Sequence, residues 1–182
     1  YEKKGLFMLC QTQKLLDEEL KLVDMAQKLG LEAKGVSPKE IKELEPNVEI
    51  NAIGAAYYEC DHHTTPHEFM AEMISYLKKV GVTFYTNEKV EDITTNNKKI
   101  TSIKTNKQNL DADEVVLAAG SWSSLLSKKL GLNLLLQAGK GYRINTQRET
   151  GITIPAILAE AKTAVTPMNG FTRFAGTMEI DG

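Results

Sequence analysis

The sequence is poor in several features that mark whole classes of protein. Its 182 residues include two cysteines, five prolines and one tryptophan. Two cysteines cannot form a disulfide framework, so a reducing, cytoplasmic setting is expected, with a single Cys10–Cys60 bond left open. The formal net charge is −2, which gives no basic surface for nucleic acid or an anionic membrane. No apolar run approaches the roughly 18 residues that a membrane span requires.

Motifs for metal binding and nucleophilic catalysis are also missing. Cys60, His62, His63 and His67 lie close together in the sequence, but Pro66 opens a helix between the last two histidines. No second ligand pair with zinc-finger spacing follows, so we predict a solvated loop and no metal site. No Ser/His/Asp or Cys/His arrangement stands out. The chain begins at Tyr1 without a leader pattern, and we expect it to be the central part of a longer protein.

What is present indicates a globular α+β protein, with 42% hydrophobic and 25% charged residues. Apolar residues at helical spacing predict helices, and the Ser37-Pro38-Lys39-Glu40 run predicts a capped helix start. The Asn96–Lys99 run between two β-rich segments predicts a hairpin. The expected helices are 14–29, 38–45, 66–80 and 121–130. The expected strands are 5–12, 53–59, 82–85, 90–94, 100–105, 113–119, 134–147, 153–158, 164–166 and 171–178, the last four as an antiparallel sheet.

The most informative run leads from Asp113 to Trp122. Its apolar strand ends in Ala118, Ala119 and Gly120. Small residues let another group approach the backbone closely, and the carboxyl end of a sheet strand is a common place for a dinucleotide. Spacing alone leaves two interpretations: a nucleotide site, or a tight strand-to-helix turn without a ligand.

The same run resembles the second flavin-binding motif of glutathione-reductase-type FAD proteins. The Trp122-Ser123 that follows is similar to the D-amino-acid oxidase/dehydrogenase family in particular. Other segments match that family in the same order: Ile41–Pro46, Ile53–Tyr58, His62–Pro66, Pro66–Val90, Gly139–Tyr142 and Arg173–Glu179. The resemblance therefore covers nearly the whole chain.

The resemblance implies an α+β fold. In it, antiparallel-sheet segments of a substrate domain, residues 1–65 and 132–182, are interrupted by part of a glutathione-reductase-type FAD-binding α/β domain, residues 66–131. FAD is the implied cofactor, bordered by Val90, Ala118, Ala119, Gly120 and Trp122. The implied substrate-side candidates are Lys140, Gly141, Tyr142 and Arg173. From the residues alone, Trp122 is more often a core residue than a cofactor contact. Lys140 and Tyr142 could equally belong to an ordinary strand, and a surface ion pair is at least as good an interpretation of Arg173.

The activity implied for the parent protein is oxidative deamination of an amino acid, in particular a D-amino acid or a glycine-like amine. Hydride transfer to FAD would give an imino acid, which hydrolyses to a keto acid and ammonia. The electrons would pass to a quinone or another carrier, and membrane association of the parent is left open. The cofactor performs the hard step, so no catalytic residue is assigned. Two alternatives remain: a non-catalytic α+β binding domain, and an FAD oxidase of sarcosine, a 2-hydroxy acid or glycerol phosphate.

Several departures from the family pattern bear on activity. The Gly-x-Gly-x-x-Gly that holds a pyrophosphate at a helix N-terminus is absent, and so is the late arginine that pairs with the substrate carboxylate. Cys60–His63 replaces the usual Asp-Gly. Thr65 stands where Asp is common, although threonine can still cap the helix that follows. We therefore expect the isolated 182-residue chain to bind FAD poorly and to be inactive.

Overall fold

The computed structural model describes residues 2–180. The chain forms two compact units. The first consists of Tyr1–Ile74 and Gly141–Glu179, and the second of Ser75–Lys140 and Ile180–Gly182. The division into substrate-domain and FAD-domain segments predicted above stays a prediction.

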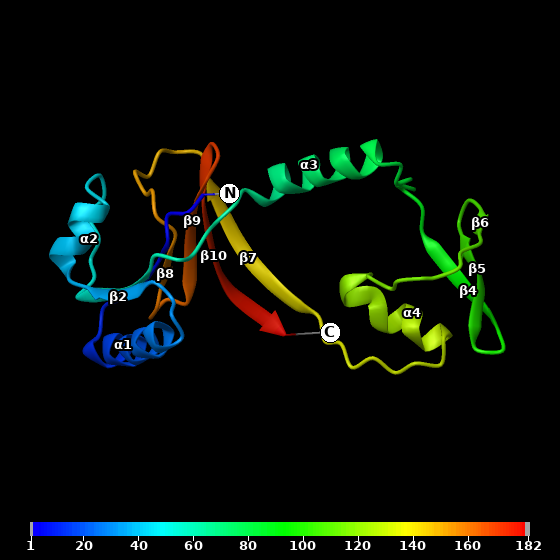
Figure 1. The fold of residues 1–182 in the computed structure, drawn as a ribbon, viewed down its shortest axis with the longest axis horizontal. Helices are drawn as coiled ribbons and strands as arrows, with labels where there is room; N and C mark the ends of the chain where they lie inside the picture. Colours follow the sequence, from blue (N-terminus) through cyan, green and yellow to red (C-terminus); the bar gives the residue numbers. More distant parts are fainter. Residues whose placement is uncertain (1, 181–182) are drawn as a thin grey trace. The chain divides into compact units, whose positions relative to one another are not determined.

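The first unit is built on a seven-stranded mixed sheet (Figure 1). Its spatial order is β2-β3-β1-β8-β9-β10-β7. The predicted antiparallel pairing is confirmed for β8 with β9 and for β9 with β10. Strands β1 and β8 run parallel, with Phe7 opposite Ala156, so the sheet is not purely antiparallel. The strands are β1 (Leu6–Cys10), β2 (Ala33–Val36), β3 (Gly54–Tyr58), β7 (Gly139–Thr146), β8 (Ala156–Leu158), β9 (Thr163–Met168) and β10 (Phe171–Ile180).

Two helices cover opposite faces of this sheet. Helix α1 (Gln13–Lys28) packs Val23 and Ala26 near Met8 and Ala56, whereas α2 (Pro38–Leu44) packs Ile41 near the remaining core residues. Those residues include Phe7, Leu9, Ala55 and Tyr57, which alternate with the residues under α1. Successive strand side chains point to opposite faces, so each helix buries one alternate set. Full burial of a side chain such as Phe7, which is 1% exposed, contributes about 2 kcal/mol.

The start of α2 is set by the capping residues predicted from the sequence. Ser37 precedes α2 with a complete capping box: its hydroxyl accepts the Glu40 N–H, and the Glu40 carboxylate accepts the Ser37 N–H. Pro38 stands at the first helical position, where its missing N–H costs nothing. The predicted helix over 38–45 is confirmed.

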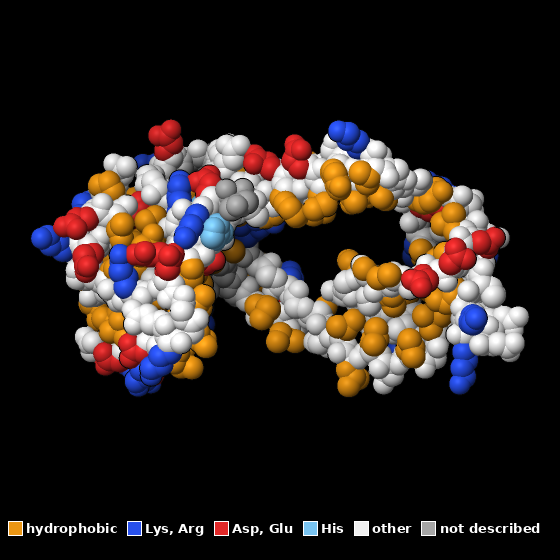
Figure 2. Space-filling view, in the orientation of Figure 1, with side chains coloured by type: hydrophobic (Ala, Val, Ile, Leu, Met, Phe, Trp, Pro, Cys, Tyr) orange, Lys and Arg blue, Asp and Glu red, His pale blue; other side chains and the backbone are white. Residues whose placement is uncertain are grey.

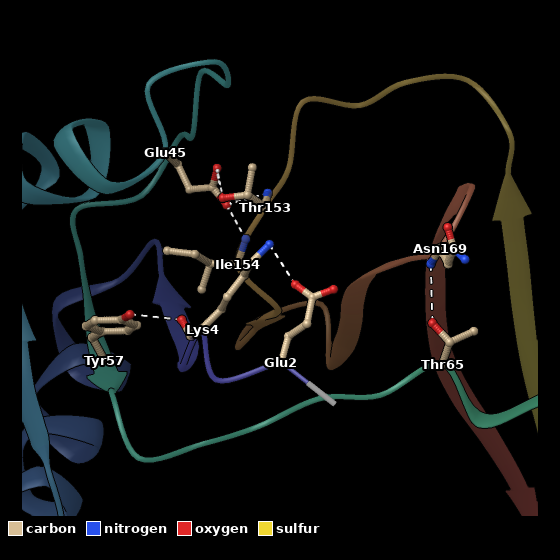
Figure 3. A network of polar contacts seen from close by, with 8 residues as sticks. All are labelled: Glu2, Lys4, Glu45, Tyr57, Thr65, Thr153, Ile154 and Asn169. Carbon is tan, nitrogen blue, oxygen red and sulfur yellow. Dashed lines mark hydrogen bonds and ion pairs between the residues drawn. The ribbon is translucent and has the colours of Figure 1, made fainter. Parts of the chain in front are cut away.

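The buried carboxylate of Glu45, at the end of α2, binds the loop that precedes β8 (Figure 3). Glu45 is 1% exposed, and its Oε1 accepts the backbone N–H groups of Thr153 at 2.7 Å and Ile154 at 2.5 Å. Nearby, the Tyr57 hydroxyl donates to the Lys4 carbonyl at 2.9 Å. A buried charge is tolerated only when it is fully hydrogen-bonded, and Glu45 meets that condition through the loop it anchors.

The second unit contains a three-stranded antiparallel sheet, β4-β5-β6, and helix α4 (Ser123–Lys129). The predicted hairpin is confirmed as β4 (Val90–Asn96) and β5 (Lys99–Thr105). Its tip residues Asn97 and Lys98 have φ of 48° and 63°, the left-handed values of a type I′ turn. Strand β6 is Asn109–Leu110, and a 3₁₀ turn, Gly120–Trp122, leads into α4.

Helix α3 (Pro66–Lys79) agrees with the predicted helix over 66–80. Its expected apolar face is present but is not covered in the part of the chain that the structure describes. Figure 2 shows hydrophobic side chains gathered along the helix, and Phe69, Met70, Met73 and Tyr76 are all more than one third exposed.

Two strand predictions, 82–85 and 113–119, are wrong for the described residues, and the strand predicted over 134–147 begins only at Gly139. Residues 82–85, 113–119 and 134–138 have strand-like composition but no ladder partner within 2–180. A strand forms only when neighbouring strands supply hydrogen bonds and burial. Val116, in the middle of the second segment, is 87% exposed, and Leu135 is 92% exposed.

Candidate functional site

A hollow of about 660 Å³ in the second unit brings together three of the residues predicted to border FAD. Val90 comes from the start of β4, Ala119 from the segment before the 3₁₀ turn, and Trp122 from its end. These positions lie up to 32 residues apart in the sequence (122 minus 90) and meet through the packing of α4 against β4. The remaining lining residues are Lys89, Glu91, Leu125, Leu126 and Lys129.

The backbone at Gly120 is open on the side where a side chain would stand. Its φ is +54°, and a Cβ built on it would meet no atom within 4 Å. Ala118 is also exposed. The arrangement therefore fits the expectation that a flat ligand lies against the backbone here.

Trp122 is 70% exposed, so its indole is not a core residue within residues 2–180. Ser127, a small residue of α4, is fully buried, and its hydroxyl donates to the Ser124 carbonyl at 3.1 Å. Small buried residues on the inner side of α4 let the helix approach the hairpin, while the apolar Leu125 and Leu126 face the hollow. Aromatic and aliphatic walls of this kind suit the flat ring systems of a nucleotide cofactor.

An ion pair ties the helix end to the hairpin. Lys129 Nζ lies 3.2 Å from Asp92 Oδ1, and this hydrogen bond lowers the pKa of the Asp92 carboxyl below its ordinary value. Both side chains are largely exposed, so the pair adds little to stability. It joins Lys129, which lines the hollow, to strand β4.

The loop that precedes β4 is fixed by its own polar contacts. The Thr105 hydroxyl donates to Glu88 Oε1 at 2.6 Å, and this contact lowers the pKa of the Glu88 carboxyl. The Lys89 N–H donates to Asn106 Oδ1 at 2.9 Å. Val90 follows these two residues directly, so contacts of Glu88 and Lys89 hold the backbone that leads into the hollow.

The substrate-side candidates lie on β7 and β10, which are neighbours in the seven-stranded sheet. Lys140, near the start of β7, is counted with the second unit. Tyr142 Oη donates to Glu179 Oε2 at 2.8 Å. Arg173 Nε donates to Asn145 Oδ1 at 3.1 Å, and the guanidinium lies 5.5 Å from the centre of the Phe171 ring. Gly141 lies between Lys140 and Tyr142 on β7. Glu179 belongs to a motif quoted above but was not predicted as a site residue.

The loop that contains His63 pairs with the N-terminal segment and contacts the turn at Asn169. His63 exchanges two backbone hydrogen bonds with Glu2, at 2.8 and 3.0 Å, and Thr65 Oγ1 accepts the Asn169 N–H at 3.3 Å (Figure 3). The His63 ring nitrogen Nδ1 is buried without a partner among the described residues, and burial lowers the pKa of the imidazole. Across residues 2–180, no three His, Cys, Asp or Glu side chains are grouped to hold a metal ion.

A second hollow, of about 320 Å³, lies in the first unit between the sheet and the loop after α2. Its walls are mostly aliphatic and aromatic, and several of its lining residues, such as Phe7 and Ile154, belong to the hydrophobic core. No predicted site residue lines it. Its acidic residues Glu45, Glu49 and Glu160 already accept hydrogen bonds or pair with Lys42, so the hollow beside Val90 and Ala119 is the stronger candidate for a cofactor.

Comparison with known families decides the class of protein. A family model described as DAO, FAD dependent oxidoreductase, matches residues 1–182. The chain belongs to this family. Both the predicted resemblance and the predicted cofactor are thereby confirmed, because members of the family depend on FAD.

The curated relatives that this chain matches are longer than the chain itself. A D-amino acid dehydrogenase of Helicobacter pylori (strain ATCC 700392 / 26695) is 30% identical over 183 residues, which cover all of this chain and 43% of the relative. A D-amino acid dehydrogenase of Vibrio vulnificus (strain CMCP6) is 28% identical over 99% of this chain and 45% of the relative. The chain thus spans less than half the length of these proteins.

Solved structures share the fold. Glycine oxidase from Geobacillus kaustophilus superimposes with a TM-score of 0.88 at 19% identity, covering all of this chain and 49% of that one. L-proline dehydrogenase from P. horikoshii gives 0.83 at 20% identity, covering 95% and 48%. The predicted fold class is confirmed. None of the helices within residues 2–180 combines the length and the apolar character needed to cross a bilayer.

Proposed function

We propose that the full protein to which this chain belongs is an FAD-dependent dehydrogenase that oxidises a D-amino acid to the imino acid. Water then converts the imino acid to a keto acid and ammonia. The hollow that joins Val90, Ala119 and Trp122, with open backbone at Gly120, is the observation that carries the proposal. The similarity to proteins named D-amino acid dehydrogenase supports this substrate class.

In this proposal the residues of the second unit bind and orient the cofactor. Val90, Ala119 and Trp122 contact it through apolar surface, and the bare backbone at Ala118–Gly120 lets it approach closely. When bound, FAD accepts a hydride from the substrate carbon that carries the amine. The protein's contribution is orientation, exclusion of water and electrostatics.

The residues of the first unit face the substrate in the proposal. Tyr142 and Arg173 lie on neighbouring strands and carry polar groups suited to a zwitterionic amino acid. Arg173 donates to an amide and lies over an aromatic ring, a geometry that fixes the guanidinium for a carboxylate. Electrons leave the enzyme to a quinone or another carrier.

The decisive experiment is expression of the complete reading frame, followed by a visible spectrum and anaerobic reduction by a panel of amines. We expect a yellow protein that D-amino acids bleach and that reduces a quinone analogue faster than oxygen. Glycine, sarcosine, 2-hydroxy acids and glycerol phosphate form the comparison set. A colourless full-length protein after gentle purification would reject the flavoenzyme, and bleaching by glycerol phosphate alone would reject the amine substrate.

A further inference from the structure

The turn between β9 and β10 contains the only Asn-Gly pair in the sequence, Asn169-Gly170. These two residues form the whole connection between the strands, since Met168 pairs directly with Phe171. Gly170 has a φ of +79°, a left-handed value that glycine adopts without steric cost. Both residues of the turn are exposed, so water reaches them from the surface.

The backbone nitrogen of Gly170 is open to reaction. Its N–H donates to no acceptor among residues 2–180. A Cβ built on Gly170 would meet no atom within 4 Å, so this side of the turn is open. The backbone nitrogen that follows an asparagine can attack the side-chain amide, and glycine hinders the attack least because it has no side chain.

The side chain of Asn169 joins this turn to the first turn of α3. Its Nδ2 donates to Glu68 Oε1 at 2.6 Å. Its backbone N–H donates to Thr65 Oγ1 at 3.3 Å (Figure 3). A hydrogen bond to an ionised acceptor is stronger than one between neutral groups, so Glu68 holds the amide in one orientation. Movement of the amide away from this orientation must break the bond.

We propose that Asn169 is a site of spontaneous deamidation and that Glu68 slows the reaction by holding the side-chain amide. The Gly170 nitrogen gives up its proton and forms a bond to Asn169 Cγ. The bond from Cγ to Nδ2 breaks, and Nδ2 leaves as ammonia with that proton. Water then opens the cyclic imide to give aspartate or isoaspartate at position 169. Water is the only co-reactant, and the exposed turn admits it.

The product reverses the contact with α3. An aspartate side chain at position 169 has no N–H to donate, and its carboxylate replaces the amide that lies 2.6 Å from Glu68 Oε1. Two carboxylates at such a distance repel each other. Isoaspartate adds a methylene group to the main chain of the turn, which disturbs the pairing of Met168 with Phe171. Deamidation therefore releases the first turn of α3 from the hairpin.

The test uses the full-length protein, incubated in mildly alkaline buffer and sampled over time. Peptide mass spectrometry and enzymatic detection of isoaspartate follow every asparagine, with a free peptide of residues 163–176 as reference. We expect Asn169 to convert before any other asparagine, and more slowly than in the peptide. Glu68→Ala should speed the conversion by about tenfold, the effect of losing one charge-assisted hydrogen bond.

Two companion variants separate the hydrogen bond from general damage to the helix. Glu68→Gln keeps an acceptor oxygen without the charge, so its rate should lie between those of the wild type and Glu68→Ala. Glu72→Ala is an exposed change one turn further along α3 and should leave the rate unchanged.

Hydrogen exchange measures the consequence for α3. The backbone N–H groups of Glu68 and Phe69 both donate to the Thr65 carbonyl. Asn169→Asp should speed exchange at these two amides by about tenfold. Asn169→Ala removes the side-chain bond without adding a charge, so its effect should be smaller.

Each outcome decides a different claim. A rate in Glu68→Ala that is equal to or below that of the wild type would overturn the holding role of Glu68. If the free peptide converts while Asn169 stays intact in both native proteins, the modification site is rejected. Unchanged exchange of the Glu68 and Phe69 amides in Asn169→Asp would contradict the release of α3.

Discussion

The Thr153 backbone N–H donates to the Glu45 carboxylate at 2.7 Å, and the Thr153 hydroxyl adds a second contact at 3.2 Å. Glu45 is almost fully buried, so these contacts and the one from Ile154 replace its hydration. The pair fastens the loop before β8 to the end of α2. The carboxylate thereby joins α2 to a loop whose residues 151–155 lie outside the sheet.

Replacing Glu45 by Ala should loosen this loop. The change removes the acceptor of the buried Ile154 N–H and of the partly buried Thr153 N–H, and we expect a loss of about 3 kcal/mol of local stability. Native-state hydrogen exchange should show faster exchange at the Thr153 and Ile154 amides. Glu43→Gln, on the exposed side of the same helix, serves as control and should leave both amides protected.

Filling the hollow should abolish cofactor binding without disturbing the fold. Ala119→Phe places a ring in the space beside Val90 and Trp122, and we expect FAD content of the full-length protein to fall below about a tenth of the wild-type value. Absorbance at the flavin band relative to total protein provides the measurement. Ala112→Phe is the matched control, since Ala112 is exposed and does not line the hollow. Full FAD content in Ala119→Phe would place the cofactor elsewhere.

The two cysteines should react at very different rates. Cys10 is fully buried, and burial raises the pKa of its thiol to about 11, whereas Cys60 is partly exposed. Since the thiolate is the reactive form, iodoacetamide at pH 8 should label Cys60 and leave Cys10 unmodified. Peptide mass spectrometry reads the result. Both sites should be labelled in denaturant, and labelling of Cys10 in the native protein would contradict its burial.

The capping box of α2 should add a pH-dependent element to stability. Hydrogen bonds from the Ser37 hydroxyl and backbone N–H lower the pKa of the Glu40 carboxyl below its ordinary value of 4.5. A carboxyl whose pKa is lowered on folding stabilises the fold above the unfolded value and loses that effect as the pH falls through the folded value. Wild type should therefore melt at a higher temperature than Glu40→Gln at pH 7, and the difference should shrink towards pH 3. A difference independent of pH would contradict this.

Local chemistry predicted most of the helices and the hairpin. The capping residues around Ser37 and the Asn96–Lys99 turn act within a few residues, so their effect can be read directly from the sequence. Strand β2 was missed because Ala33–Val36 contains lysine and glycine and shows no clear alternation. It forms because β3 supplies a partner, from Ala33 opposite Tyr58 to Val36 opposite Ala55.

The residues that depend on distant pairing could not be predicted from the sequence. The strand expected over 113–119 finds no ladder partner among residues 2–180, although its composition is that of a buried strand. Likewise, the contact between Tyr142 and Glu179 joins two neighbouring strands across 37 residues of sequence, which no local pattern encodes. By contrast, Val90, Ala119 and Trp122 were chosen from a motif resemblance, and packing brings them to one hollow.

The parallel pairing of Phe7 with Ala156 has a consequence for biosynthesis. Strand β1 is translated before residues 75–140 of the second unit, so its neighbour β8 on that side does not exist until those residues have been translated. Closing so long a loop is slow, and an unpaired edge is prone to aggregation in the meantime. In the meantime β1 can already pair with β3 and pack against α1, so we expect this antiparallel layer to form before the β1–β8 pair.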